Sequence, residues 1–136
     1  MPIIVPASDG AGAFEMLYSQ AGMAQVLYPP NAFPVPLPAT IAGGANWLSG
    51  LIFSEGYRYI TLAVTSTQAG AANIQTYLNL AGTIARVVST TPIVANTALI
   101  VDISDLKPFV TLTVQITNTS GSPATVTGLQ LILAAG

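Results

Sequence analysis

The sequence predicts an all-β fold, namely an antiparallel β-sandwich or jelly roll of about seven to eight strands with an extended N-terminal arm. Three observations lead to this prediction. Apolar and polar residues alternate with a period of two through most of the chain after residue 46, and turn-forming residues separate the alternating runs. No window of useful length carries the apolar stripe of a helix. Thr, Val and Ile, which favour pleated sheet, dominate the runs.

The alternating runs give the expected strands and their inward faces. The expected strands are 47–53, 57–67, 73–80, 83–88, 97–103, 109–117 and 125–133. The expected inward side chains are Ile60, Leu62 and Val64, then Ile74, Thr76, Leu78 and Leu80, then Leu99, Val101 and Ile103, and finally Val110, Leu112, Val114 and Ile116. The connections 68–71, 81–82 and 118–123 contain residues that tolerate tight or left-handed backbone, so they read as turns.

The first 46 residues differ in composition and are rich in Gly, Ala and Pro. The segment 29–38 holds five prolines in ten residues, which excludes a helix or a central strand and favours an extended polyproline path. Within a single domain, we expect residues 1–46 to form an arm with edge segments, including a short strand at 23–28, and residues 47–136 to form the body. The arm residues expected to contact a partner are Tyr28, Pro29, Pro30, Phe33, Pro34, Pro36 and Pro38.

The unusual property of the composition is its low charge. The 136 residues fit one domain, yet only 6% of them are charged, against about 25% in typical domains. An uncharged surface loses little hydration on contact, and the cores of protein–protein interfaces are depleted in charge. Long uncharged strands also need their edges covered, by the chain's own arm, a sister subunit or a lattice. We therefore expect a protein that works in an assembly, the alternative being an ordinary soluble domain of low charge.

The sequence lacks the residues on which several classes of function depend. The chain has no His and no Cys, so we expect no enzyme, no cofactor and no metal site. The net charge is −2 and the three cations are far apart, so neither a nucleic-acid groove nor a polybasic membrane anchor is expected. No apolar run approaches the roughly 20 residues of a membrane helix, and the start of the sequence lacks a signal-peptide pattern. Synthesis and assembly in the cytoplasm are therefore expected.

The few carboxylates and other reactive side chains are better explained as turn or loop residues than as catalytic residues. The carboxylates are Asp9, Glu15, Glu55, Asp102 and Asp105, and nothing in their spacing selects a glycosidase-like pair. A calcium loop at 102–105 lacks the full ligand pattern, and Ser104 with Lys107 reads as a loop before a strand.

The tyrosines offer one candidate binding surface. Tyr57, Tyr59 and Tyr77 are expected to share an outward face, where they would stack on a sugar or become buried in a subunit contact. Packing at the edge of the core is the equally favoured alternative.

The C-terminal part of the chain resembles a known family. The segments 102–109 (DISDLKPF), 111–120 (TLTVQITNTS) and 124–128 (ATVTG) are similar in character to small virion proteins, namely the jelly-roll cement or decoration proteins of tailed-phage heads. The resemblance covers residues 47–136 and carries over no binding residue. It implies a domain that clamps neighbouring major capsid subunits, often as a dimer or trimer with extended arms.

These observations together predict a virion structural protein. It would bind the major capsid protein as a homo-oligomer on the capsid surface and stabilise the shell. The alternative function, from another class, is a carbohydrate- or receptor-binding module of a phage tail fibre or adhesin, because Thr-rich alternating strands occur there too.

Overall fold

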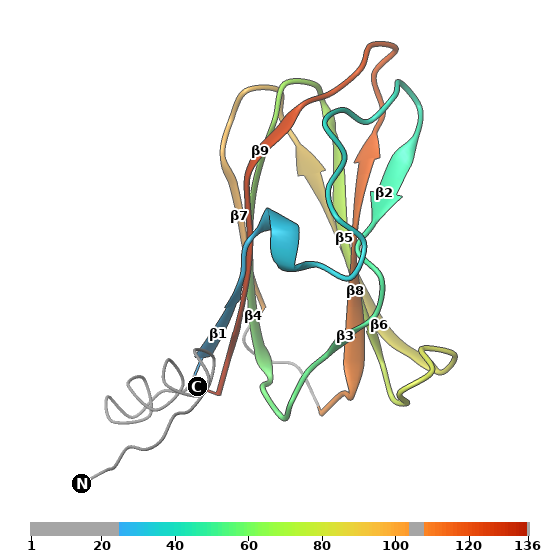
Figure 1. Ribbon diagram of the computed structural model, residues 1–136, viewed down its shortest axis with the longest axis vertical. Helices are drawn as coiled ribbons and strands as arrows, with labels where there is room; N and C mark the ends of the chain where they lie inside the picture. Colours follow the sequence, from blue (N-terminus) through green and yellow to red (C-terminus); the bar gives the residue numbers. More distant parts are fainter. Residues whose placement is uncertain (1–24, 104–107, 136) are drawn as a thin grey trace, which may run out of the picture.

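The computed structural model describes residues 25–103 and 108–135, which form two antiparallel sheets packed face to face (Figure 1). The strands are β1 (Gln25–Tyr28), β2 (Asn46–Leu48), β3 (Ile52–Phe53), β4 (Tyr59–Ser66), β5 (Gly70–Tyr77), β6 (Ala85–Ile93), β7 (Leu99–Ile103), β8 (Thr111–Asn118) and β9 (Val126–Ala134), and a 3₁₀ turn, η1 (Pro30–Ala32), follows β1. The predicted all-β sandwich is confirmed. Within these ranges, no helix is long and apolar enough to cross a membrane.

The strand order identifies the sandwich as a jelly roll. One sheet has the order β1-β9-β4-β7 and the other has the order β2-β8-β5-β6. β3 pairs with β8 further along the same edge as β2, so β2 and β3 act as one interrupted strand. Each strand therefore pairs with its counterpart from the other half of the chain: β1 with β9, β2–β3 with β8, β4 with β7, and β5 with β6. This is a long antiparallel ribbon, with the β5–β6 hairpin at its tip, rolled into two sheets.

The core lies between the two sheets and follows the period-two pattern. The inward side chains of β4, β8 and β9 are almost completely buried: Ile60, Leu62, Val64, Leu112, Val114, Ile116, Leu129, Leu131 and Leu133. The partly buried Leu99, Val101 and Ile103 of β7 pack against them. The inward faces predicted for 57–67 and 97–103 are confirmed, as are the three buried positions of β8.

The predicted inward face is wrong at the end of the run 73–80. β5 ends before Leu78, and both Leu78 and Leu80 are exposed. The reason is the side chain between them. Asn79 Oδ1 accepts a hydrogen bond from the backbone N–H of Thr83 at 3.0 Å, which turns the chain into the connection to β6.

From Gln25 onward, the expected arm is part of the body. β1 is hydrogen-bonded to β9, and Phe33 is only 3% exposed. The Phe33 ring meets the buried Trp47 ring edge to face, with centroids 5.4 Å apart. The proline-rich segment thus supplies an aromatic side chain to the core. Residues 1–24 lie outside the described ranges.

The stretch between β1 and β2 crosses from one sheet to the other, and we call residues 29–45 the crossing segment (Figure 1). The Trp47 indole N–H donates to the carbonyl oxygens of Val35 at 3.2 Å and Pro36 at 3.1 Å. The Val35 N–H donates to the Ser49 carbonyl at 2.9 Å. The prediction of an extended path without helix is wrong at the start of the segment, which forms the 3₁₀ turn η1 and then bends at 33–35, and polar groups of the segment bond to this chain.

A local break separates β2 from β3. Ser49 is fully buried, and its Oγ accepts the backbone N–H of Val114 at 2.9 Å in place of a ladder bond. Gly50 follows with φ +83°, a conformation that disfavours any residue with a Cβ. The break leaves Leu51 39% exposed beside the sheet.

Replacing Phe33 tests its place in the core. We expect Phe33→Ala to lower the free energy of unfolding by about 3–5 kcal/mol, because it leaves a cavity against Trp47. The control is Val35→Ala, two residues away, where the side chain is 45% exposed and the change should be within about 0.5 kcal/mol. Urea unfolding followed by Trp47 fluorescence measures both. Equal small effects would contradict a core role for Phe33.

Candidate functional site

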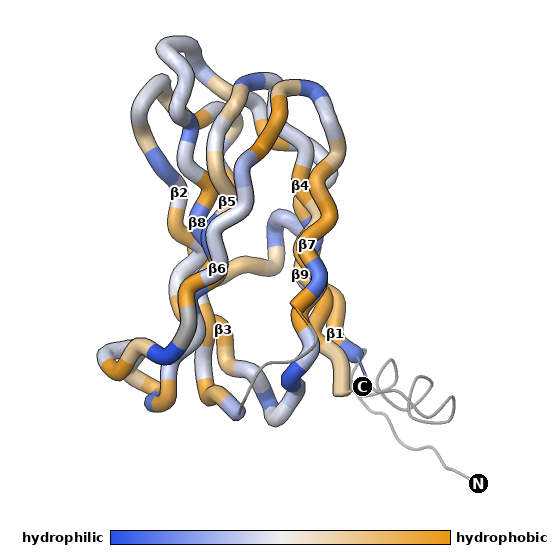
Figure 2. Tube along the Cα trace, turned by 180° about the vertical axis from the view of Figure 1, so that it is seen from behind, coloured by the Kyte–Doolittle hydropathy of each residue, from blue (hydrophilic) through white to orange (hydrophobic). Residues whose placement is uncertain are grey.

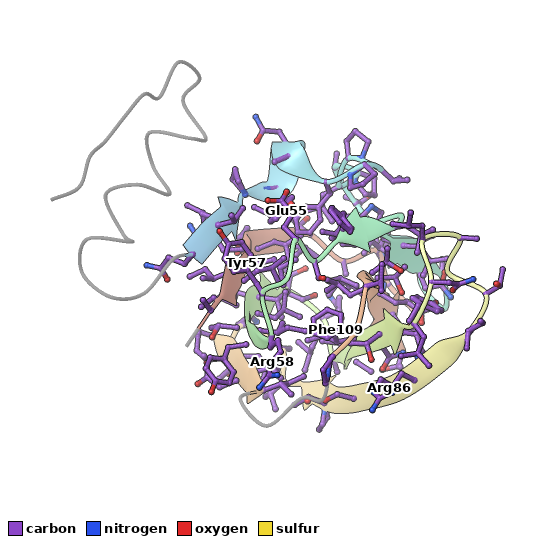
Figure 3. The ribbon with its side chains drawn as sticks, turned by 90° about the horizontal axis from the view of Figure 1, so that it is seen from below. Glu55, Tyr57, Arg58, Arg86 and Phe109 are labelled. Carbon is purple, nitrogen blue, oxygen red and sulfur yellow. The ribbon has the colours of Figure 1, made fainter. Side chains whose placement is uncertain are left out.

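The charged side chains that the structure describes gather at one end of the sandwich. Glu55 and Arg58 lie in the connection between β3 and β4, Arg86 is the second residue of β6, and Asp102 lies one residue before the end of β7. Figure 3, seen from this end, shows Glu55, Arg58 and Arg86. We call it the charged end.

Among the residues that the structure describes, none of those at the opposite end is charged. It is built by four connections, residues 39–45, 67–69, 94–98 and 119–125, which contain only small or neutral side chains. We call it the neutral end. The strands that lead to it are nearly as free of charge, since Arg86 and Asp102 are the only charged residues in β1–β9. Charge in the described parts of the chain is therefore segregated along the long axis of the sandwich.

A single buried side chain holds two of the neutral-end connections together. Asn118, only 2% exposed, donates from Nδ2 to the carbonyl oxygens of Ile41 at 2.9 Å and Ser122 at 2.7 Å. Its Oδ1 accepts from the backbone N–H of Ser120 at 3.0 Å and from the Ser120 hydroxyl at 2.7 Å. The whole hydrogen-bonding capacity of the amide is thus used on loop backbone and on the Ser120 hydroxyl. A surface fixed in this way would lose little further entropy in a contact with a partner.

The other two connections are tied to the same end by further hydrogen bonds. The Thr67 N–H donates to the Thr125 carbonyl at 3.0 Å, and the Thr125 N–H donates to Thr67 Oγ1 at 2.9 Å. The Asn96 N–H donates to the Ser66 carbonyl at 2.7 Å. All four connections are therefore anchored to one another or to strand ends.

The sequence predicted turns at the neutral end but missed the role of Asn118. An asparagine before a Thr-Ser-Gly-Ser-Pro stretch indicates a turn. Its bond to the distant Ile41 depends on the strand order, which brings the crossing segment beside the end of β8.

The expected partner-contact residues fall into three groups in the structure. Pro34, Pro36 and Pro38 are exposed, whereas Tyr28, Pro29 and Pro30 are half-buried. Phe33 is buried in the chain's own core and is not available to a partner. A contact through the exposed prolines stays a prediction.

The expected surface of tyrosines is corrected. Tyr57 is 8% exposed and belongs to the core, because β4 starts two residues later and Tyr57 lies outside its alternation. Tyr59 and Tyr77 are half-buried, but they lie on β4 and β5, which belong to different sheets. The three side chains do not share a face.

The candidate metal and catalytic groups are not brought together. Asp102 lies on the outer side of β7, where its Oδ1 accepts a hydrogen bond from the Thr61 hydroxyl at 2.7 Å. In the ranges described, no group of three or more His, Cys, Asp or Glu residues is placed to hold a metal ion. Ser104, Asp105 and Lys107 lie outside these ranges, as do Asp9 and Glu15.

Comparison with protein-family models, with curated proteins and with solved structures finds no match for this chain.

Removing the Asn118 side chain tests its role at the neutral end. We expect Asn118→Ala to lower the free energy of unfolding by about 2–4 kcal/mol, because it removes the buried hydrogen bonds of the amide to the Ile41 and Ser122 carbonyls and to Ser120. Asn46→Ala, at an exposed position on the adjacent β2, is the matched control and should change little. Thermal unfolding measures both. If the two variants melt alike, Asn118 does not hold this end.

Proposed function

We propose that the chain is a non-enzymatic structural protein of a larger assembly, and specifically a capsid cement protein that docks on the shell through its neutral end. The observation that carries the proposal is the segregation of charge. The four charged side chains in the described part of the chain lie at one end, and none lies at the other. The resemblance to phage decoration proteins supports the capsid as the partner.

The physical argument rests on the cost of removing water. A charged group that becomes buried without a partner in an interface loses hydration at a cost of several kcal/mol, whereas Thr, Ser, Ala and Gly surfaces lose far less. Apolar area buried on the shell contributes roughly 25 cal/mol per Å² before the costs of association. The hydrogen bonds of Asn118 fix the neutral end before it docks, which lowers those costs.

The fold is compatible with this role, although a fold alone does not determine function. Jelly rolls occur in viral capsid domains and in lectins. The capsid role implies a protein that assembles in the host cytoplasm and ends on the capsid surface, with the major capsid protein as its partner.

The carbohydrate-binding alternative gains no specific support. A sugar platform needs exposed aromatic faces. Trp47 is 4% exposed and donates its N–H to the crossing segment, and Tyr57 is also buried. Tyr59 and Tyr77 belong to different sheets.

Introducing charge at the neutral end tests the proposal. We expect Ala69→Lys combined with Ala98→Lys, both exposed positions of this end, to weaken binding to empty shells of the cognate major capsid protein by at least tenfold. The reason is that each lysine must lose hydration in the contact. Co-sedimentation of the chain with shells measures the bound fraction.

The control places a single lysine at the other end. Ala135→Lys, an exposed position just after β9, should leave binding unchanged. Shell binding that is lost equally in both variants would show a general effect of charge and contradict docking through the neutral end. A wild-type chain that never sediments with shells would remove the capsid proposal.

A further inference from the structure

A group of large apolar side chains is exposed at the charged end. The group consists of Leu51, Phe53, Leu78, Leu80 and Ile84, which are 39%, 52%, 42%, 68% and 52% exposed, and we call it the apolar tip. Its members come from the β2–β3 break, from β3 and from the β5–β6 connection. Figure 2 shows hydrophobic colour at the β5–β6 connection, outside the sheets.

Contacts on one side of the tip make it continuous. A Cβ built on Gly82 would lie 2.5 Å from Leu51 Cδ2, so the Leu51 side chain lies directly on the β5–β6 connection. Within that connection, the Leu78 N–H donates to the Ile84 carbonyl at 2.9 Å, which pairs these two residues. The two chain segments therefore form one surface.

The sheet ties the other side of the tip to the same surface. Phe53 of β3 pairs with Thr111 of β8, and Thr111 pairs in turn with Tyr77 at the end of β5. The Thr111 hydroxyl donates to the Asn79 carbonyl at 2.9 Å, so the β5–β6 connection is fastened beside the Phe53 strand. The apolar side chains sit on backbone that is already hydrogen-bonded.

The area of the tip fits a contact with a second copy. The exposed fractions of its five members amount to about two and a half side chains, or on the order of 500 Å² of apolar surface. Two copies meeting tip to tip would bury about 1,000 Å² before any neighbouring residue is counted, which reaches the size of a specific interface. A two-fold contact uses the same patch on both subunits.

The apolar tip has charged residues of opposite sign beside it, which allows two copies to present opposite charges to each other. Glu55 follows Phe53 by two residues and Arg86 follows Ile84 by two, and both are exposed. Figure 3 shows Glu55 and Arg86 apart from each other at this end. A two-fold axis that passes between these two positions would bring Glu55 of one copy toward Arg86 of the partner subunit, so that opposite charges meet at the margin of an apolar centre.

We infer that the apolar tip is a homodimer contact, and that its occupant is a second copy of this chain. The inference does not rest on the capsid role, because the tip and the neutral end lie at opposite ends of the sandwich. It assigns the association to five residues and to a two-fold arrangement.

The first test removes apolar surface from the tip. Sedimentation equilibrium of the full chain from about 1 to 100 µM should show a dimer with a measurable dissociation constant. Phe53→Ser combined with Leu80→Ser should raise this constant at least tenfold. The matched control combines Val94→Ser and Ile100→Ser, which are 64% and 58% exposed but lie in the neutral end and in the other sheet, and it should change nothing. Circular dichroism and thermal melting check that each variant is folded.

The second test exchanges charges across the two-fold axis. Arg86→Glu and Glu55→Arg should each raise the dissociation constant about twofold to fivefold, as expected for exposed pairs, and the combined variant should restore it. A wild-type chain that is monomeric up to 100 µM overturns the inference, and so does a dimer that the tip variant leaves intact or that the control variant also dissociates. Loss of shell binding in the tip variant without any wild-type dimer would assign the tip to the shell and equally overturn it.

Discussion

The Trp47 side chain fastens the crossing segment, which connects the two sheets, to the sandwich. Prolines lack the N–H with which a strand bonds to its neighbour, so a proline-rich segment must be held through its carbonyl groups and its side chains. The indole supplies a donor to two of those carbonyls and a ring that packs edge to face with Phe33. Because the prolines already restrict the backbone, fixing the segment costs less entropy than fixing an ordinary loop.

The same contact helps to protect the sheet edges in a chain with little charge. An open, uncharged edge strand pairs readily with other chains. The edge formed by β2 and β3 is interrupted at Ser49, whose carbonyl is occupied by the crossing segment. At the opposite edge of this sheet, β6 contains Arg86 next to a bulge and Pro92 near its far end, and both discourage further pairing. In this chain the crossing segment, the break at Ser49 and the proline in β6 protect the sheet edges, as surface charge does in most domains.

The sequence was sufficient for the fold class but not for the order of the strands. Period-two alternation reports which side chains face inward, and it did so correctly for β4 and β7. It contains no information on which strands are neighbours, because one Thr- and Val-rich strand resembles another. The period-two pattern of the sequence also continues past the true end of β5, because it gives no sign that the Asn79 side chain bonds to the connection that follows.

The residues of the candidate site were harder to predict for a related reason. Phe33 lies among prolines, which indicate an exposed segment, yet its burial depends on Trp47 from another part of the chain. Asn118 reads as a turn residue, and its role depends on Ile41, 77 positions away. Tyr57 fits the period-two pattern of the sequence that forms β4, but it lies before the first residue of that strand. For Phe33 and Asn118 the deciding contact is non-local, and local pattern carries no signal for it.

The two ends of the molecule suit two different kinds of contact. The apolar tip has a small apolar centre with charges beside it, so its orientation is set by the charges and its strength by the apolar area. The neutral end has no charges to steer it, so its selectivity must come from shape, which the Asn118 hydrogen bonds keep constant. The proposed dimer, joined at the tips, would turn both neutral ends outward. The first attachment to a lattice would then raise the effective concentration of the second neutral end near a second site, so that two weak contacts would hold more firmly than either does alone.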